Sequence, residues 1–254
     1  MTRPVKVPAA HQALMVLAHL GRQVGPVPAA ALARDLGLPR STTYQLLATL
    51  AATGFVVHLV DERRWSLGVA AYELGTGYVR QAPLARVARV PLARLVDRVG
   101  QSAHLVVQHG REVVYVIEER APGRPSLVTD VGVRLPAQLT ASGRAMLAAL
   151  PAAQVRALFP SPEAFVTRHE AGPRTISALR RLLADVRRTG YAVEDGEVTP
   201  GFASVAVAVL DHARHPVAGV AVTFPCAGPA VVEPPLVAEV ARTVRAITAR
   251  MGWS

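Results

Sequence analysis

The sequence has one cysteine, one lysine and no long hydrophobic run, and each scarcity excludes a class of protein. With Cys226 alone the chain cannot form an intrachain disulfide, and no Cys/His cluster has the spacing of zinc ligands. Unbroken apolar runs reach only six residues, far below the roughly 18 that a membrane-spanning helix needs. The apolar stretch after Lys6 is interrupted by His11 and His19, unlike a signal peptide. We therefore expect a cytoplasmic protein with no membrane partner.

Apolar residues and arginine are what the chain has in excess. Of its 254 residues, 51% are hydrophobic and 18% are charged, which is enough to form the core of one large domain or two smaller ones. The 28 basic and 18 acidic residues give a net charge of +10, which favours nucleic acid as a partner. All basic residues except Lys6 are arginines, and they are spread along the chain. The charge alone therefore does not separate a binding surface from a compositional bias.

The first 68 residues have the pattern of a small helical domain with a hairpin. Apolar residues at helical spacing predict three helices, over residues 8–24, 28–36 and 39–53. Two further runs predict the strands of a hairpin, over residues 55–58 and 65–67. A tight turn at Gly37 joins the second and third helices, and the hairpin tip carries Arg63 and Arg64. This order is typical of a winged helix-turn-helix domain.

The third helix of this pattern has one apolar and one polar side. Its inward stripe is formed by Thr43, Leu46, Leu47 and Leu50. The residues that suit DNA contacts are Arg40, Ser41, Thr42, Tyr44 and Gln45 on this helix, with Arg63 and Arg64 at the hairpin tip. Glutamine can form two hydrogen bonds with adenine, and arginine can reach guanine or phosphate. An ordinary three-helix bundle with a solvated polar face remains the alternative.

Beyond residue 68 the pattern mixes helices and strands. Further helices are predicted over residues 69–81, 84–99, 141–150, 151–158, 175–189 and 237–251. Strands are predicted over residues 102–108, 113–118, 126–131, 203–210 and 216–224. We therefore expect a domain at 1–68, a linker helix at 69–82 and a second domain at 83–254. The linker helix has apolar residues for packing against a partner subunit or against the hairpin of its own chain, namely Val69, Tyr72, Leu74, Tyr78 and Val79.

Several segments together resemble one protein family. Leu36–Leu50, followed by Gly54–Phe55 and Trp65–Gly68, is similar to the winged-helix domain of IclR-type bacterial transcriptional regulators. Segments of the second domain resemble the same family in the family's order, at Leu135–Pro136, Thr140–Ala145, Gly190–Glu197 and Gly201–Ala206. The chain departs from the family pattern at Gln45, Ala137, Gln138, Arg144, Ser204 and Ala221.

The resemblance implies an α+β protein, with an N-terminal winged helix-turn-helix, a linker helix and a GAF-like C-terminal domain that binds an effector. It implies a homodimer or dimer of dimers on double-stranded operator DNA, controlled by a small organic acid or aromatic metabolite. The implied effector contacts are Ala141, Ser142, Glu194, Ser204, Ala221 and Thr223.

The chemistry of these residues fits an acid in part. Free backbone N–H groups at Ser142 and Gly143, where a helix begins, would suit a carboxylate. Glu194 fits an anion less well; it would accept a hydrogen bond from a ligand hydroxyl or amine, or pair with an arginine. Ser204 and Thr223 either bind the ligand through their hydroxyls or are ordinary strand residues.

An enzyme and a ligand-binding module that acts through protein partners are the competing classes. The sequence has no G-x-S-x-G motif and no evident histidine partner for a nucleophilic serine. His212 and His215 lie in a predicted turn, which does not align them as metal ligands. We therefore expect a regulator without catalytic residues, cofactor or metal, and keep as alternatives a small-molecule enzyme and a ligand-binding sensor that acts without DNA.

Overall fold

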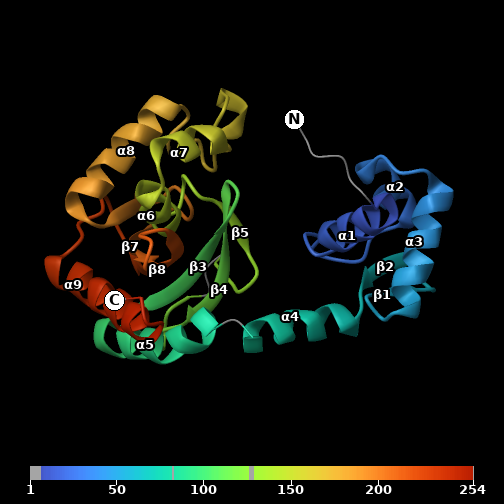
Figure 1. Cartoon of the computed structure of the whole chain (residues 1–254), viewed down its shortest axis with the longest axis horizontal. Coiled ribbons are helices and arrows are strands. Elements are labelled where there is room, and N and C mark those ends of the chain that lie inside the picture. The colour runs from blue at the N-terminus through green and yellow to red at the C-terminus, as the bar shows by residue number, and fades with distance from the viewer. Residues whose placement is uncertain (1–6, 82, 126–128, 254) are drawn as a thin grey trace. The chain divides into compact units, whose positions relative to one another are not determined.

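The computed structural model describes residues 7–81, 83–125 and 129–253, and it describes side chains outside residues 76–83. The chain divides into two compact units, Met1–Gln81 and Ala82–Ser254 (Figure 1). The side chains of Tyr78 and Val79, which we expected to contribute to the linker helix's apolar surface, lie outside the described set.

The described part of the first unit is a winged helix-turn-helix. Its helices are α1 (Pro8–Leu20), α2 (Ala29–Leu36), α3 (Arg40–Ala52) and α4 (Val69–Gln81), and its hairpin is formed by β1 (Val56–Leu59) and β2 (Arg64–Leu67). Gly37 ends α2 in the left-handed conformation, with φ of 65°, which allows α3 to begin within a few residues. Val16, Leu32 and Leu47 are fully buried at the centre of the unit. Backbone hydrogen bonds of 2.8 Å in both directions between Val27 and Trp65 fix the hairpin beside α2.

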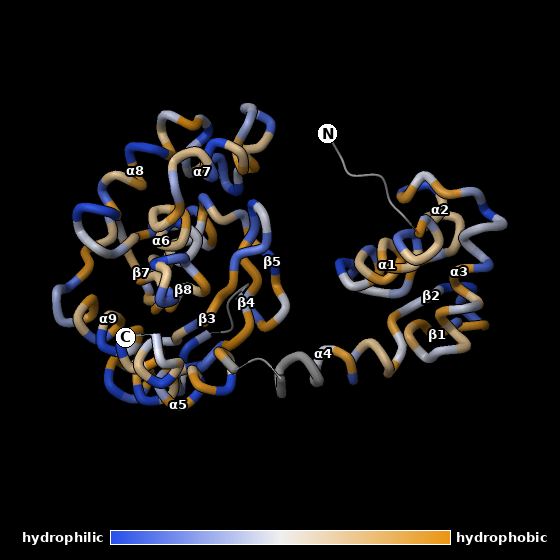
Figure 2. Tube along the Cα trace, in the orientation of Figure 1, coloured by the Kyte–Doolittle hydropathy of each residue, from blue (hydrophilic) through white to orange (hydrophobic). Residues whose placement is uncertain are grey.

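The described part of the second unit is built on a six-stranded antiparallel sheet with the order β5-β4-β3-β8-β7-β6. The strands are β3 (Ser102–His109), β4 (Glu112–Glu119), β5 (Arg134–Pro136), β6 (Ala192–Asp195), β7 (Phe202–Leu210) and β8 (Pro216–Pro225). The helices are α5 (Pro83–Val99), α6 (Ala141–Ala149), α7 (Ala152–Leu158), the 3-10 turn η1 (Pro162–Ala164), α8 (Ile176–Thr189) and α9 (Pro234–Arg250). Figure 2 shows hydrophobic residues along β3 and β4 and hydrophilic residues along α8.

Helices cover both faces of this sheet. On one face, Val205, Val220 and Val222 pack with residues of α5 and α9 in a large apolar core. Side chains alternate between the two faces of a strand, so the neighbours of these valines lie on the opposite face, beneath α6. The residues there are small. Ala192, Ala206 and Ala221 form this small-residue surface, together with Ala141 and Ala145 of α6.

Two glycines bring α6 close to its neighbours. A Cβ atom on Gly219 of β8 would lie 2.9 Å from the Cβ atom of Ser142. A Cβ atom on Gly143 would lie 2.2 Å from the carbonyl oxygen of Ala137. Such distances leave no room for a side chain, so these glycines set the position of the first turn of α6.

Some predicted boundaries are wrong. Part of the strand predicted over 126–131 lies outside the described residues, and residues 129–131 are not in a strand; the edge strand is β5 instead. Sequence reasoning missed β6, because its apolar residues are few and Glu194 and Asp195 end it. Helix α1 ends at Leu20 and not at 24, since Gly21 stops it. Helix α9 begins at Pro234, ahead of 237, since proline is well tolerated in a first helical turn.

Candidate functional sites

The exposed face of α3 carries the residues predicted to contact DNA. Arg40, Ser41, Tyr44 and Gln45 are exposed, and Thr42 is half-buried. The inward stripe is confirmed for the most part, since Thr43, Leu47 and Leu50 are buried and Leu46 is half-buried. The Thr43 hydroxyl donates a 3.0 Å hydrogen bond to the carbonyl oxygen of Pro39, which ties the first turn of α3.

The two arginines of the hairpin have different surroundings. Arg63 is exposed in the turn and has a left-handed backbone, with φ of 52°. Arg64 lies on β2, where its Nη1 donates a 3.2 Å hydrogen bond to the carbonyl oxygen of Pro26. Arg63 therefore projects from the tip of the hairpin, whereas Arg64 also supports the packing of the hairpin on its own unit.

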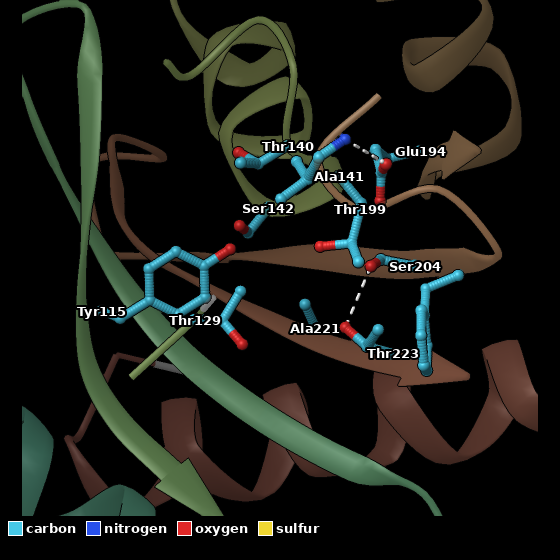
Figure 3. A pocket seen from close by; sticks show the side chains of 12 residues that line it. Tyr115, Thr129, Thr140, Ala141, Ser142, Glu194, Thr199, Ser204, Ala221 and Thr223 are labelled. Carbon is cyan, nitrogen blue, oxygen red and sulfur yellow. Dashed lines mark hydrogen bonds between the residues drawn. The ribbon is translucent and has the colours of Figure 1, made fainter. Parts of the chain in front are cut away.

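Six of the seven predicted effector residues line one cavity in the second unit, between α6 and the sheet (Figure 3). We call it the candidate cavity. Its lining is Tyr115, Thr129, Thr140, Ala141, Ser142, Glu194, Val198, Thr199, Phe202, Ser204, Ala221 and Thr223. The volume of the cavity is about 20 Å³, close to the room that a single water molecule needs. The cavity must therefore widen to admit a molecule much larger than water.

The register of three strands brings the sheet residues of the cavity into one row. Glu194 of β6 is paired with Ser204 of β7, and Ser204 is paired with Thr223 of β8. Directly paired residues project from the same face of an antiparallel sheet. The hydroxyls of Ser204 and Thr223 are 2.9 Å apart and share a hydrogen bond (Figure 3).

Gly143 is the one predicted effector residue that does not line the cavity. Its N–H donates a 3.0 Å hydrogen bond to Oγ1 of Thr140, which caps α6. The free N–H group that we expected at this position is therefore already bonded. The first-turn N–H groups that remain as candidates are those of Ala141 and Ser142.

Tyr115 and Thr129 also line the cavity and were missed from the sequence. His104 contacts both side chains and is 1% exposed; its Nε2 lies 3.0 Å from Oγ1 of Thr129, and its ring lies edge-on to that of Tyr115, with 5.4 Å between the ring centroids. Burial lowers the pKa of His104 to about 4, with a further contribution from the positive charge of Arg120. His104 is therefore neutral near pH 7. No sequence motif indicates these contacts, because they depend on strand register and on residues that are far apart in the chain.

Glu194 is a buried carboxyl, 3% exposed, at one end of the cavity. Burial raises its pKa from an ordinary 4.5 to about 7. The N–H of Val198 donates a 2.9 Å hydrogen bond to Oε1 of Glu194 and opposes this rise, whereas the negative charge of Glu197 adds to it. Glu194 is thus divided between its two protonation states near neutral pH.

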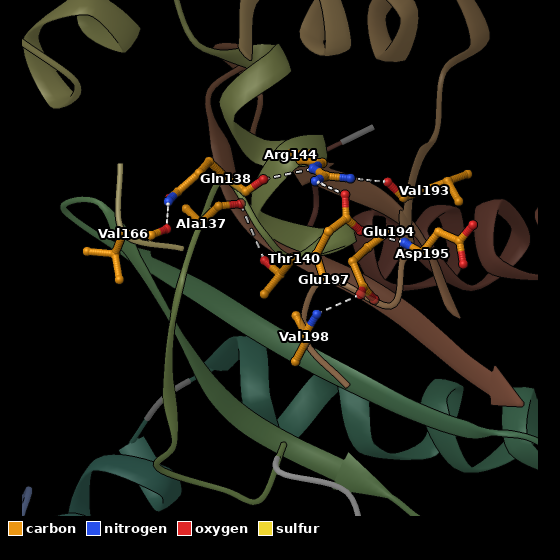
Figure 4. A network of polar contacts seen from close by, with 10 residues as sticks. All are labelled: Ala137, Gln138, Thr140, Arg144, Val166, Val193, Glu194, Asp195, Glu197 and Val198. Atoms are coloured by element: carbon orange, nitrogen blue, oxygen red, sulfur yellow. Dashed lines mark hydrogen bonds and ion pairs between the residues drawn. The ribbon is translucent and has the colours of Figure 1, made fainter. Parts of the chain in front are cut away.

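Arg144 bonds to other groups than Glu194 (Figure 4). Its Nε donates to the carbonyl oxygen of Gln138 at 2.8 Å, and its Nη1 to that of Val193 at 2.7 Å. Its Nη2 lies 2.6 Å from Oε1 of Glu197. We had left open that Glu194 forms an ion pair with an arginine. The structure shows that Glu197, and not Glu194, forms the ion pair with Arg144.

Comparison with known proteins decides the family. A profile described as the bacterial transcriptional regulator IclR C-terminal domain matches residues 76–249, and the IclR helix-turn-helix domain matches residues 9–59. The chain belongs to the IclR family of bacterial transcriptional regulators. The probable transcriptional regulator SauR of Cupriavidus necator is 32% identical to it over 222 residues, which cover 86% of each chain.

Solved IclR structures share the fold. The crystal structure of an IclR regulator from Alicyclobacillus acidocaldarius is 25% identical, with a TM-score of 0.80 over 98% of this chain and 100% of that one. An IclR homologue from Microbacterium hydrocarbonoxydans, solved with 4-hydroxybenzoate, is 22% identical, with a TM-score of 0.78 over 97% and 100% of the chains. The N-terminal helix-turn-helix and the C-terminal α+β domain therefore have the architecture of an IclR regulator that binds DNA.

Two negative findings concern the described residues alone. No helix among them is long and apolar enough to cross a membrane. No three of their His, Cys, Asp and Glu side chains gather where they could hold a metal ion.

Proposed function

We propose that this IclR regulator changes its affinity for operator DNA when a small organic acid or aromatic metabolite binds in the candidate cavity. The observation that carries the proposal is the convergence of α6 with β6, β7 and β8, which brings Ser142, Glu194, Ser204 and Thr223 around one space. The chain is proposed to act as a regulator and not as an enzyme, in the cytoplasm.

In this proposal DNA is bound by α3 and the hairpin. The exposed N-terminal part of α3 would enter the major groove, where Gln45 reads a base and Arg40 reaches a base or phosphate. Ser41, Thr42 and Tyr44 would add contacts, and Arg63 and Arg64 would bind the flanking backbone. The exposure of these side chains around a buried stripe supports this assignment.

An acid effector is supported by the polar lining of the cavity. The first-turn N–H groups of Ala141 and Ser142 would receive a carboxylate. Ser204 and Thr223 would bind other polar atoms, while Ala221 leaves room for an apolar part. A relative of the same fold has been solved with 4-hydroxybenzoate, which is an aromatic acid.

The narrowness of the cavity supports coupling to DNA. An effector can shift a conformational equilibrium only if it binds the two states with different affinity. A cavity that must widen to admit its ligand meets that condition, because only the widened state accepts the molecule. The sign of the response, release or strengthening of DNA binding, is left to measurement.

We also propose a homodimer, or a dimer of dimers, as the DNA-binding form. Two recognition helices related by symmetry would read the two halves of an operator. On α4 the side chains of Val69, Tyr72 and Leu74 are 67%, 73% and 66% exposed, respectively. Such apolar exposure on a helix supports packing against a second subunit.

A gel-shift titration tests this function. We expect full-length protein to bind duplex from upstream of its gene in excess random competitor, and to weaken as salt rises. Gln45→Ala should lose this selectivity, and a small acid should shift the affinity of the wild type but not of a Ser204→Val variant. Binding abolished by random competitor would contradict the DNA assignment. Absence of any response to acids or aromatic metabolites would contradict the effector assignment.

A further inference from the structure

The candidate cavity contains a carboxyl group and, among the described residues that line it, no positively charged side chain. Apart from Glu194, its polar lining consists of hydroxyl groups, those of Tyr115, Thr129, Thr140, Ser142, Thr199, Ser204 and Thr223. Hydroxyl groups can donate hydrogen bonds to an anion but carry no charge to neutralise it. The charge of a bound acid must therefore be balanced in another way.

The ionisable groups that face Glu194 come from three elements. They are Arg144 from α6, Glu197 from the β6–β7 connection and Tyr115 from β4. Arg144 is already paired with Glu197, so the two charges largely cancel at the cavity. Burial raises the pKa of Tyr115, which stays neutral. Burial brings the pKa of Glu194 to about 7, so this carboxyl changes its charge near neutral pH.

An unsatisfied donor lies on the opposite side of the cavity. Ser142 is 1% exposed, and its hydroxyl faces the hydroxyl of Tyr115, but no contact to it among the described residues has the full geometry of a hydrogen bond. In Figure 3 its side chain projects from α6 into the space that faces Tyr115 and Thr129. A buried hydroxyl without a partner costs free energy unless a ligand or water satisfies it. This group and the first-turn N–H groups of α6 together form a receptor for acceptor oxygens.

We propose that Glu194 determines the charge of the effector: the cavity binds a small monocarboxylate while Glu194 is protonated, so that binding takes up a proton wherever Glu194 is ionised in the free protein. The carboxylate receives hydrogen bonds from the α6 side and from the acid form of Glu194. The proton comes from solvent, and no covalent bond forms or breaks. This inference rests on the proposed function of the cavity as the effector site.

Two carboxyl groups in one buried space explain why a proton is needed. Two negative charges close together cannot both be stable in a low-dielectric site, and such pairs share a proton. Since burial already holds the pKa of Glu194 near 7, protonation requires little free energy at neutral pH. A bound anion would raise this pKa further, so proton uptake and anion binding support each other.

Calorimetry on the full chain tests the proposal, with acetate, glycolate and benzoate as probes, each beside its neutral amide. Above the pKa of Glu194 we expect the Kd of a bound acid to rise about tenfold per pH unit. Repeating the titration in buffers with different ionisation enthalpies should show proton uptake that increases with pH and approaches one proton per acid above this pKa. The amides should bind without pH dependence, and Glu194→Gln should bind the acid without pH dependence.

Several outcomes would overturn the proposal. They are an acid affinity that does not change with pH, one that rises with pH, and failure of all three acids to bind at about pH 6.

A carbon-13 NMR titration of the glutamate carboxyls, assigned with Glu194→Gln, gives a readout that needs no probe. A Glu194 midpoint below about 5 would also contradict it. If an acid binds with proton uptake but leaves operator affinity unchanged, this inference stands and the proposed regulatory role of the cavity fails.

Discussion

Arg144 and Glu197 form an ion pair 2.6 Å long that joins the two sides of the candidate cavity (Figure 4). Arg144 lies on α6, beside the Ser142 side of the cavity, and Glu197 lies in the β6–β7 connection that follows Glu194. Their side chains are only 4% and 16% exposed, respectively. The second oxygen of Glu197 accepts a 2.6 Å hydrogen bond from the N–H of Asp195. The pair thus fixes the separation of the groups proposed to bind the effector.

Replacement of Arg144 by methionine should strongly destabilise the second unit. The variant leaves the Glu197 carboxylate and the carbonyl groups of Gln138 and Val193 without their donor. Breaking a buried ion pair in this way costs about 3–5 kcal/mol in the free energy of unfolding. Urea denaturation measures this loss.

The matched control is Arg188→Met on α8, whose partner Asp185 is 66% exposed. An exposed pair contributes only about 0–1 kcal/mol. Equal losses in the two variants would contradict the importance of the Arg144 pair.

Gly143→Ala should also destabilise the protein, because its Cβ atom would lie 2.2 Å from the carbonyl oxygen of Ala137. The first turn of α6 would have to shift, and overpacking of this kind costs about 1–3 kcal/mol. Thermal denaturation measures the effect. Gly75→Ala on α4 is the control, because a Cβ atom there meets nothing within 4 Å. That variant should be neutral or more stable by up to about 1 kcal/mol.

The sequence was sufficient for the order of most elements, because short-range signals specify them. Gly37 and the apolar stripe of α3 predict the helix-turn-helix, and each needs only neighbouring residues. The family resemblance also led to six residues that line one cavity. The resemblance, and not the spacing, supplied them, since Ser142, Glu194 and Thr223 are far apart in the chain.

What the sequence did not predict depends on strand pairing and close packing. Tyr115 reaches the cavity because β4 pairs with β3, and Thr129 reaches it from a position outside the described helices and strands. Glycine at 143 is consistent both with a free N–H at a ligand and with close packing against a neighbour. The structure shows the second arrangement, with its N–H bonded to Thr140.

The pH dependence of stability should change in Glu194→Gln. Burial raises the pKa of Glu194 from 4.5 to about 7, so the folded state keeps a proton that the unfolded state loses. The stability contributed by this group therefore falls as pH rises from about 4.5 to about 7, and the penalty is complete above that range. The variant lacks this penalty.

Relative to wild type, Glu194→Gln should gain stability between about pH 5 and pH 8, by at most about 3 kcal/mol. Urea denaturation at several pH values measures it. A difference that stays constant over this range, or that decreases, would show that the pKa of Glu194 is not raised in the folded state.

Gln45→Ala and Arg63→Ala should weaken DNA binding in different ways. Gln45→Ala removes a base contact, which should cost about 1–3 kcal/mol in the free energy of binding to the operator and little in that of binding to random duplex. Arg63→Ala removes a phosphate contact, which should weaken the binding of both duplexes. It should also lower by about one the slope of log affinity against log salt concentration. Arg180 is an exposed arginine on α8 in the second unit. Arg180→Ala removes the same charge and should change neither the affinity for either duplex nor the salt slope. Equal effects of Arg63→Ala and Arg180→Ala would indicate that net charge alone is responsible.

The most direct test of the central claim is operator affinity with and without effector in an Ala221→Leu variant. Ala221 lines the candidate cavity and is 4% exposed, so a leucine side chain would fill the space. The probe is the small acid that shifts the operator affinity of the wild type most. We predict that a folded variant binds operator as the wild type does and no longer responds to that acid. An unchanged response would show that the effector acts elsewhere and would contradict the account.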